Sequence, residues 1–237
     1  MDNFSTPERR QVVDLTAVNR FLAKMYGLMA LAVFVSAVTA YLTMTSYKVP
    51  VMTFFGAHPA MLWLTMLVPV GLSMGISFKA TRNPVAGTIM LMLLAITYGF
   101  VFALIAGFYT GSTIATAFVS AAAIFVGMAV IGTTTKRSLD NIGAYARAAL
   151  IGLIVALVVN LFLQNPMIDY VFSIIAVVIF TALTAYDAQK MKELYLNYGN
   201  QVSATGLATV GALQLYLDFI NLFIYLLEIF GIGGRRN

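Results

Sequence analysis

The chain has 237 residues and a formal net charge of +5, and 61% of its residues are hydrophobic while only 10% are charged. Soluble domains carry about 25% charged residues, so this composition excludes an ordinary soluble globular domain. The absence of cysteine excludes disulfides and thiol catalysis, and the single histidine, His58, cannot make a metal site by itself.

Predominantly apolar runs of roughly 20 residues, the length of helix that crosses about 30 Å of hydrocarbon, recur along the whole chain. We expect seven spanning helices, at 22–43, 59–78, 85–107, 112–132, 148–164, 167–187 and 205–230. The prediction is therefore an all-α membrane protein. Its transmembrane domain covers 22–230, between a cytoplasmic N-terminal tail at 1–21 and a short C-terminal tail at 231–237.

The basic residues fall mainly on one side of these spans. With the N-terminus in the cytoplasm, that side carries Arg9, Arg10, Arg20, Lys24, Lys79, Arg82, Lys136, Arg137, Arg147, Lys190 and Lys192. The other side carries Lys48, Arg235 and Arg236. This positive-inside bias predicts a multi-pass protein of the cell membrane (inner or plasma) with a cytoplasmic N-terminus. The bias also explains the net positive charge without a nucleic-acid partner.

Two of the nine acidic residues are not explained by a position in a loop or at a helix end. They are Asp187, in "TALTAYDAQK", and Asp218, in "LQLYLDFINLF". A carboxylate at the centre of a membrane helix costs on the order of 2.5–3.5 kcal/mol on insertion scales. An ionisable group at this depth is therefore a functional candidate by default.

Asp218 lies on a polar stripe of the last helix. At 100° per residue, one face of about 100° gathers the following residues: Gly211, Gln214, Asp218, Asn221, Tyr225 and Glu228. Such a stripe must face protein or a water-filled cavity. A structural hydrogen-bond network explains Gln214 and Asn221 at least as well as a direct functional role, and Glu228 fits an interfacial charge or the outer mouth of a path.

The midpoint between the two aspartates falls in the turn-like "NYGNQVSAT". If the sixth helix continues through "AQKMKELYL", each aspartate lies about 11 residues, or roughly 16 Å of helix, from the turn. An antiparallel hairpin then allows the carboxyl groups to meet at one depth on the cytoplasmic side. Two adjacent carboxylates cannot both ionise cheaply and are expected to share a proton. Doubly ionised, they offer the hard oxygen ligands that Ca²⁺ prefers, so protons and Ca²⁺ would compete for the pair.

The segments "FTALTAYDAQKMK", "GALQLYLDFINLFIYLLEIFG" and "GTTTKRSL" closely resemble the Bax inhibitor-1 family, or transmembrane Bax-inhibitor-motif proteins, and the short tail resembles a prokaryotic member. The resemblance implies a seven-helix bundle whose last helix is central and wrapped by the other six. It implies a pH-sensitive Ca²⁺ leak channel with a di-aspartyl sensor at Asp187 and Asp218, and no permanently bound cofactor. The family's basic latch on the second helix is represented here only by Lys79 and Arg82, at the cytoplasmic end of that helix.

The sequence is also compatible with functions other than a channel. An intramembrane aspartyl protease requires Gly-x-Gly-Asp at the second aspartate, where this chain has "LYLD", so we expect no enzyme. A Ca²⁺/proton exchanger would use the same pair and is not separated from a channel by sequence. Some bacterial relatives are regarded as modulators of a membrane-bound protease through helix contacts, which leaves an interaction protein as the non-transport alternative. The expected partners are the lipid bilayer, Ca²⁺ and protons, with a membrane protease as the alternative.

Overall fold

The structure, a computed structural model, describes residues 15–199 and 201–234, and this part of the chain is helical without a strand. The basic residues Arg9, Arg10, Arg235 and Arg236 lie outside the described residues. The helices are α1 Leu15–Thr45, α2 Lys48–Ala57, α3 Pro59–Lys79, α4 Pro84–Ala106, α5 Gly111–Thr134, α6 Asp140–Leu163, α7 Pro166–Tyr198 and α8 Ala204–Gly234.

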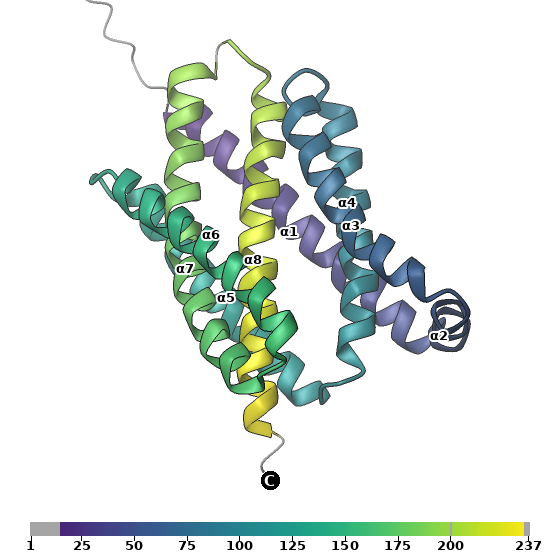
Figure 1. The fold of residues 1–237 in the computed structure, drawn as a ribbon. Coiled ribbons are helices and arrows are strands. Elements are labelled where there is room, and N and C mark those ends of the chain that lie inside the picture. The colour runs from purple at the N-terminus through teal and green to yellow at the C-terminus, as the bar shows by residue number, and fades with distance from the viewer. Residues whose placement is uncertain (1–14, 200, 235–237) are drawn as a thin grey trace, which may run out of the picture.

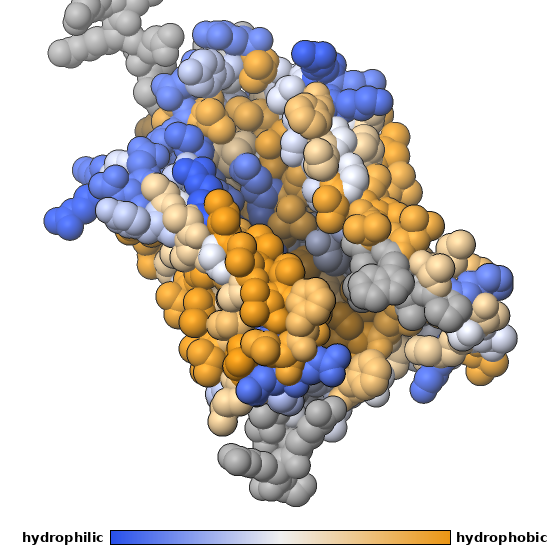
Figure 2. Space-filling view, viewed as in Figure 1, coloured by the Kyte–Doolittle hydropathy of each residue, from blue (hydrophilic) through white to orange (hydrophobic). Residues whose placement is uncertain are grey.

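Six of these helices are long and apolar enough to cross a membrane: α1, α4, α5, α6, α7 and α8. The predicted span at 59–78 coincides with α3. The apolar stretch of α3 at Leu67–Lys79 is shorter than the six candidate spans. Six candidate spans are therefore present in the described part of the chain, and the count of seven stays a prediction. Figure 2 shows hydrophobic residues over the flanks of the bundle, as expected of a surface that faces lipid.

Several helices are longer than the predicted spans because their polar first or last turns are also helical. α1 is already helical at Leu15, within the predicted tail 1–21, and α6 begins at Asp140 instead of at residue 148. α7 continues to Tyr198, which confirms the extension through "AQKMKELYL". α8 likewise continues past residue 230, into the predicted C-terminal tail.

The start of α1, the α3–α4 turn, the α5–α6 connection and the α7–α8 turn lie toward the upper part of the bundle in Figure 1. We call this side the basic end, because its connections and adjoining turns hold Lys79, Arg82, Lys136, Arg137 and Lys190. The opposite end holds the α4–α5 and α6–α7 connections and the end of α8 (Figure 1). This arrangement agrees with the predicted segregation of charge, and the compartment that each end faces stays a prediction.

α8 is the central helix. In its most apolar window 67% of residues are buried, against at most 39% in the other candidate spans. It packs against α1, α3, α4, α5 and α7, whereas α6 packs mainly on α7. The central position agrees with what the family resemblance implied, but five helices, and not six, pack closely around α8 in the described part of the chain.

A buried polar contact joins α8 to α1 and α4. The Oη of Tyr216 lies 2.7 Å from Ser36 Oγ, which lies 2.8 Å from the carbonyl oxygen of Ala95. Ser36 has one proton and donates it to a main-chain carbonyl, so Tyr216 is the donor to Ser36. Aromatic rings continue the packing, with Phe219 5.6 Å from Phe118 between ring centroids.

Two glycines allow α5 and α6 to approach α7 closely. A Cβ atom at Gly132 of α5 would clash with the main-chain carbonyl of Ala185, and one at Gly143 of α6 would clash with the ring of Tyr186. Both contacts lie beside Asp187 on α7. Small residues at such positions let membrane helices pack at short distance, so these glycines set the position of the helices that surround Asp187.

We expect Gly132→Ala to destabilise the protein by about 1–3 kcal/mol, because α5 must move away from α7. Gly127 lies on the same helix, and a Cβ atom there meets nothing within 4 Å, so Gly127→Ala is the matched control. Thermal unfolding in detergent micelles measures the difference. Equal unfolding temperatures for the two variants would contradict the close α5–α7 contact.

Candidate functional site

The α7–α8 hairpin brings the two aspartates together. α7 is one continuous helix through Asp187, and α8 begins at Ala204 after a short turn. Ser203 caps α8, since its carbonyl accepts from Leu207 N at 2.9 Å and its hydroxyl accepts from Gly206 N at 3.2 Å. Asp187 lies 11 residues before the end of α7 and Asp218 lies 14 residues after the start of α8, so the antiparallel hairpin places the two side chains at similar depths.

The carboxyl groups of Asp187 and Asp218 lie within hydrogen-bonding reach of each other. Asp218 is only 5% exposed, whereas Asp187 is half-buried. Asp218 Oδ2 is buried and has no N–H or hydroxyl partner among the described residues. An ionised oxygen left in this position would be costly, so the contact requires a proton held between the two carboxyl groups or a cation bound to them.

Arg147 of α6 is the basic residue next to this pair. Its guanidinium lies 4.8 Å from the centre of the Tyr186 ring and interacts electrostatically with Asp187. Arg147 is exposed, so its guanidinium interacts with Asp187 and also meets the medium. A guanidinium in this position competes with any cation that approaches Asp187.

The residues that follow Asp187 hold the α5–α6 connection onto α7. Gln189 Oε1 accepts from Leu139 N at 2.7 Å, and its Nε2 donates to Arg137 O at 2.9 Å. Lys192 Nζ donates to Thr133 O at 2.7 Å, at the end of α5. The segments "YDAQKMK" and "GTTTKRSL" are therefore in direct contact, although the sequence separates them by about fifty residues.

The polar stripe of α8 is not uniformly enclosed. Gln214 is exposed, Asn221 is half-buried with its Nδ2 donating to Leu217 O of the same helix at 2.8 Å, and Tyr225 is half-buried and stacks on Phe180. The exposure of Gln214 follows from the packing of α6 on α7, which leaves the basic half of α8 open on one side. Figure 2 shows hydrophilic residues in a hollow over the upper half of the molecule, beside the start of α6.

Glu228 lies on α8 toward the opposite end. Its Oε2 accepts from Ser173 Oγ of α7 at 2.7 Å, so it links the two helices of the hairpin. Asp169 of α7 lies near it and accepts from Asn160 of α6. Between Asp218 and Glu228, the rings of Phe180 on α7 and Tyr225 on α8 stack with their centroids 6.0 Å apart. Along the hairpin, these rings lie between the carboxyl pair and the contact of Glu228 with Ser173.

The predicted latch residues, Lys79 and Arg82, lie exposed at the end of α3 and in the α3–α4 turn. The basic residue that interacts with Asp187 is Arg147, so the latch assignment to Lys79 and Arg82 stays a prediction. Within residues 15–199 and 201–234, no group of three or more His, Cys, Asp and Glu side chains could hold a metal ion. A cation at the pair would thus have two carboxyl groups as protein ligands and would take its other oxygens from water or carbonyls.

Fold and site together define a class: a multi-pass helical membrane protein with a carboxyl pair at the centre of its C-terminal hairpin. The chain belongs to the Bax inhibitor-1 family, because residues 18–235 match the family described as "Inhibitor of apoptosis-promoting Bax1". It is 37% identical over 214 residues to an uncharacterized membrane protein of Streptococcus pyogenes, covering 90% of this chain and 93% of the relative. It is 35% identical over 234 residues, 98% of each chain, to an uncharacterized protein of Borreliella burgdorferi.

Sequence reasoning missed two features of the site. The sequence prediction places Arg147 among the loop cations, because the expected span begins at residue 148. A helix extended back to Asp140 would have placed Arg147 inside it, seven residues from its start. The sequence pattern does not predict the contact of Ser36 with Tyr216. A serine in an apolar helix is common, and the partners of Ser36, Ala95 and Tyr216, lie on two other helices.

We expect Gln189→Leu to release the α5–α6 connection, because the variant loses both hydrogen bonds to the main chain of residues 137 and 139. Two such bonds contribute roughly 1 kcal/mol each, so cleavage by trypsin after Lys136 or Arg137 should accelerate at least about ten-fold. Gln201→Leu, at an exposed position of the α7–α8 turn, is the control. Cleavage of Gln189→Leu at the wild-type rate would contradict this role of Gln189.

Proposed function

We propose that this protein is a pH-sensitive, Ca²⁺-permeable leak channel in which Asp187 and Asp218 bind either protons or Ca²⁺. The observation that carries the proposal is the contact of the two carboxyl groups, with one of them buried on the central helix. Asp218 is buried, and its Oδ2 has no N–H or hydroxyl partner among the described residues, which is a costly way to hold two helices together, so a role in binding cations is the better explanation.

Access to the pair supports transport. Asp187 is half-buried, and Gln214, one turn before Asp218 on α8, is exposed. A cation can therefore approach the pair from the basic end through polar surface. The proposal requires the Phe180 and Tyr225 rings to separate when a cation passes beyond Asp218. Loss of the shared proton places two negative charges side by side, and their repulsion provides a force that moves α7 relative to α8.

The test is Ca²⁺ flux into liposomes that contain the purified protein, measured from about pH 6 to pH 8. We expect the wild-type flux to change by roughly ten-fold across this range, and Asp218→Asn to remove this dependence, because the variant cannot release a proton at that position. Asp140→Asn is the matched control, since Asp140 is an exposed carboxylate 3.8 Å from Lys190 at the same end. No flux from folded wild-type protein at any pH would reject transport and favour the alternative function, regulation of a membrane protease by helix contacts.

A leak channel and a Ca²⁺/proton exchanger differ in the movement of protons. A pH dye inside the same liposomes reports whether a Ca²⁺ gradient, imposed without a pH gradient, drives protons in the opposite direction. Proton movement that is present with the Ca²⁺ gradient and absent without the gradient identifies an exchanger. Ca²⁺ flux that is not accompanied by proton movement identifies a leak.

We expect Arg147→Gln to increase Ca²⁺ flux several-fold at a fixed pH, because it removes the positive charge that competes with Ca²⁺ beside Asp187. Arg147→Lys keeps the charge and should stay close to wild type. If the glutamine variant conducts no more than wild type, or if the lysine variant matches it, Arg147 does not limit access to the pair.

A further inference from the structure

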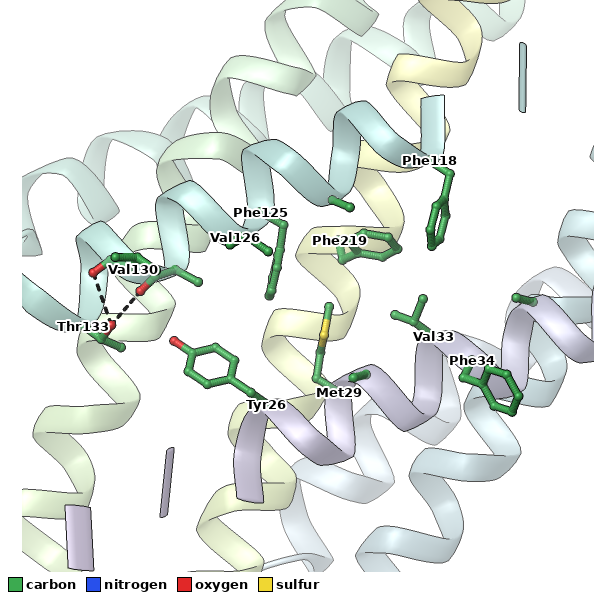
Figure 3. A pocket seen from close by; sticks show the side chains of 14 residues that line it. Tyr26, Met29, Val33, Phe34, Phe118, Phe125, Val126, Val130, Thr133 and Phe219 are labelled. Atoms are coloured by element: carbon green, nitrogen blue, oxygen red, sulfur yellow. Dashed lines mark hydrogen bonds between the residues drawn. The ribbon is translucent and has the colours of Figure 1, made fainter. Parts of the chain in front are cut away.

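A long apolar groove lies between α1 and α5, on α8 as its floor. It has a volume of about 560 Å³, and Met29, Val33, Phe125 and Phe219 line it (Figure 3). α1 and α5 both pack on α8, and the groove is the space that remains between them. It is distinct from the carboxyl pair, which is formed by the hairpin of α7 and α8.

The groove follows α1, one of the helices that are long and apolar enough to cross a membrane. Its lining on α1 spans Tyr26 to Ala37, about 16 Å of helix, which is about half of the roughly 30 Å hydrocarbon core. Toward the opposite end it meets a second apolar cavity of about 610 Å³, which shares Val33, Ala37, Phe118 and Phe219 as lining residues. The groove thus has the length and surface for a chain that belongs to one leaflet.

The size of the groove selects among occupants. A helix with its side chains is about 10 Å across. A helix from a partner or from a second copy would therefore contact the groove with one face only. A flexible hydrocarbon chain is thin enough to lie along the groove, over the rings of Phe125 and Phe219, which contact each other edge to face.

The end of the groove nearest the basic end is polar. The hydroxyl of Tyr26 points toward Thr133 in Figure 3, and its oxygen is buried without a hydrogen bond of ordinary geometry in the described part of the chain. Thr133 uses its own hydroxyl proton on the carbonyl of Ala129 at 2.8 Å. Lys192 Nζ lies 2.7 Å from Thr133 O, so a positive charge stands at this end. The Tyr26 hydroxyl interacts with the Thr133 side chain, so the apolar groove ends in a tyrosine hydroxyl and an ammonium group, which matches a lipid with an anionic head group.

We propose that the α1–α5 groove binds a membrane phospholipid, with one acyl chain between α1 and α5 and an anionic head group near Tyr26 and Lys192. The occupant is a lipid of the surrounding bilayer, which reaches the groove from the side. The proposal does not depend on the proposed transport function, because none of the groove residues belongs to the carboxyl pair.

Native mass spectrometry of the full chain, released from detergent micelles, measures the lipid that stays bound. We expect phosphatidylglycerol to be retained in preference to phosphatidylcholine with the same acyl chains. Val126 lines the groove and is 60% exposed, so Val126→Trp should fill the groove from the lipid side and abolish retention. Val119→Trp, at another exposed valine of α5 that is not part of the groove lining, is the matched control.

Tyr26→Phe tests the polar end without altering the groove. The loss of one hydrogen bond should weaken phosphatidylglycerol binding about five-fold, whereas Tyr145→Phe at an exposed site on α6 should change nothing. Equal retention in Val126→Trp and Val119→Trp, or equal retention of the two lipids by wild type, would overturn the proposal. A dimer that Val126→Trp dissociates would overturn it in favour of a second copy of the chain as the occupant.

Discussion

The position of Asp218 constrains the rest of the structure. A carboxyl group buried on the central helix of a membrane bundle has no water to solvate it, so the protein must supply a partner at the same depth. Asp187 is that partner, and it can take this position only because α7 continues beyond the hydrophobic span and returns through a short turn into α8. The long hairpin thus brings Asp187 to the depth of the buried carboxyl group.

The same constraint organises the basic end. Gly132 and Gly143 let α5 and α6 approach α7 beside Asp187, and Gln189 then binds the connection between these two helices. Each polar residue of the segment around Asp187 therefore has a separate partner: Tyr186 packs against Arg147, and Lys192 binds the end of α5. Movement of α7 would consequently be transmitted to α5, α6 and the connection between them.

α8 also supports a second face that has different chemistry. The residue that follows Asp218 is Phe219, whose ring forms part of the floor of the apolar groove between α1 and α5. One helix thus presents a carboxyl group toward α7 and aromatic rings toward α1 and α5. The alternation is possible because neighbouring residues of a helix point about 100° apart, so polar and lipid-facing surfaces can share one central helix.

The sequence by itself determined the membrane class, the positions of most spans, the extension of α7 and the expectation that Asp187 and Asp218 meet, because segment hydrophobicity and distance from a turn are local properties. Only the tertiary structure decided that α6 packs on α7 and leaves Gln214 exposed, and that Arg147 is the cation beside Asp187. The contact of Ser36 with Tyr216 and Ala95 was likewise not predictable from the sequence. These features depend on which faces of distant helices meet, and in a bilayer apolar helices gain little from one neighbour over another, so hydropathy does not specify the choice.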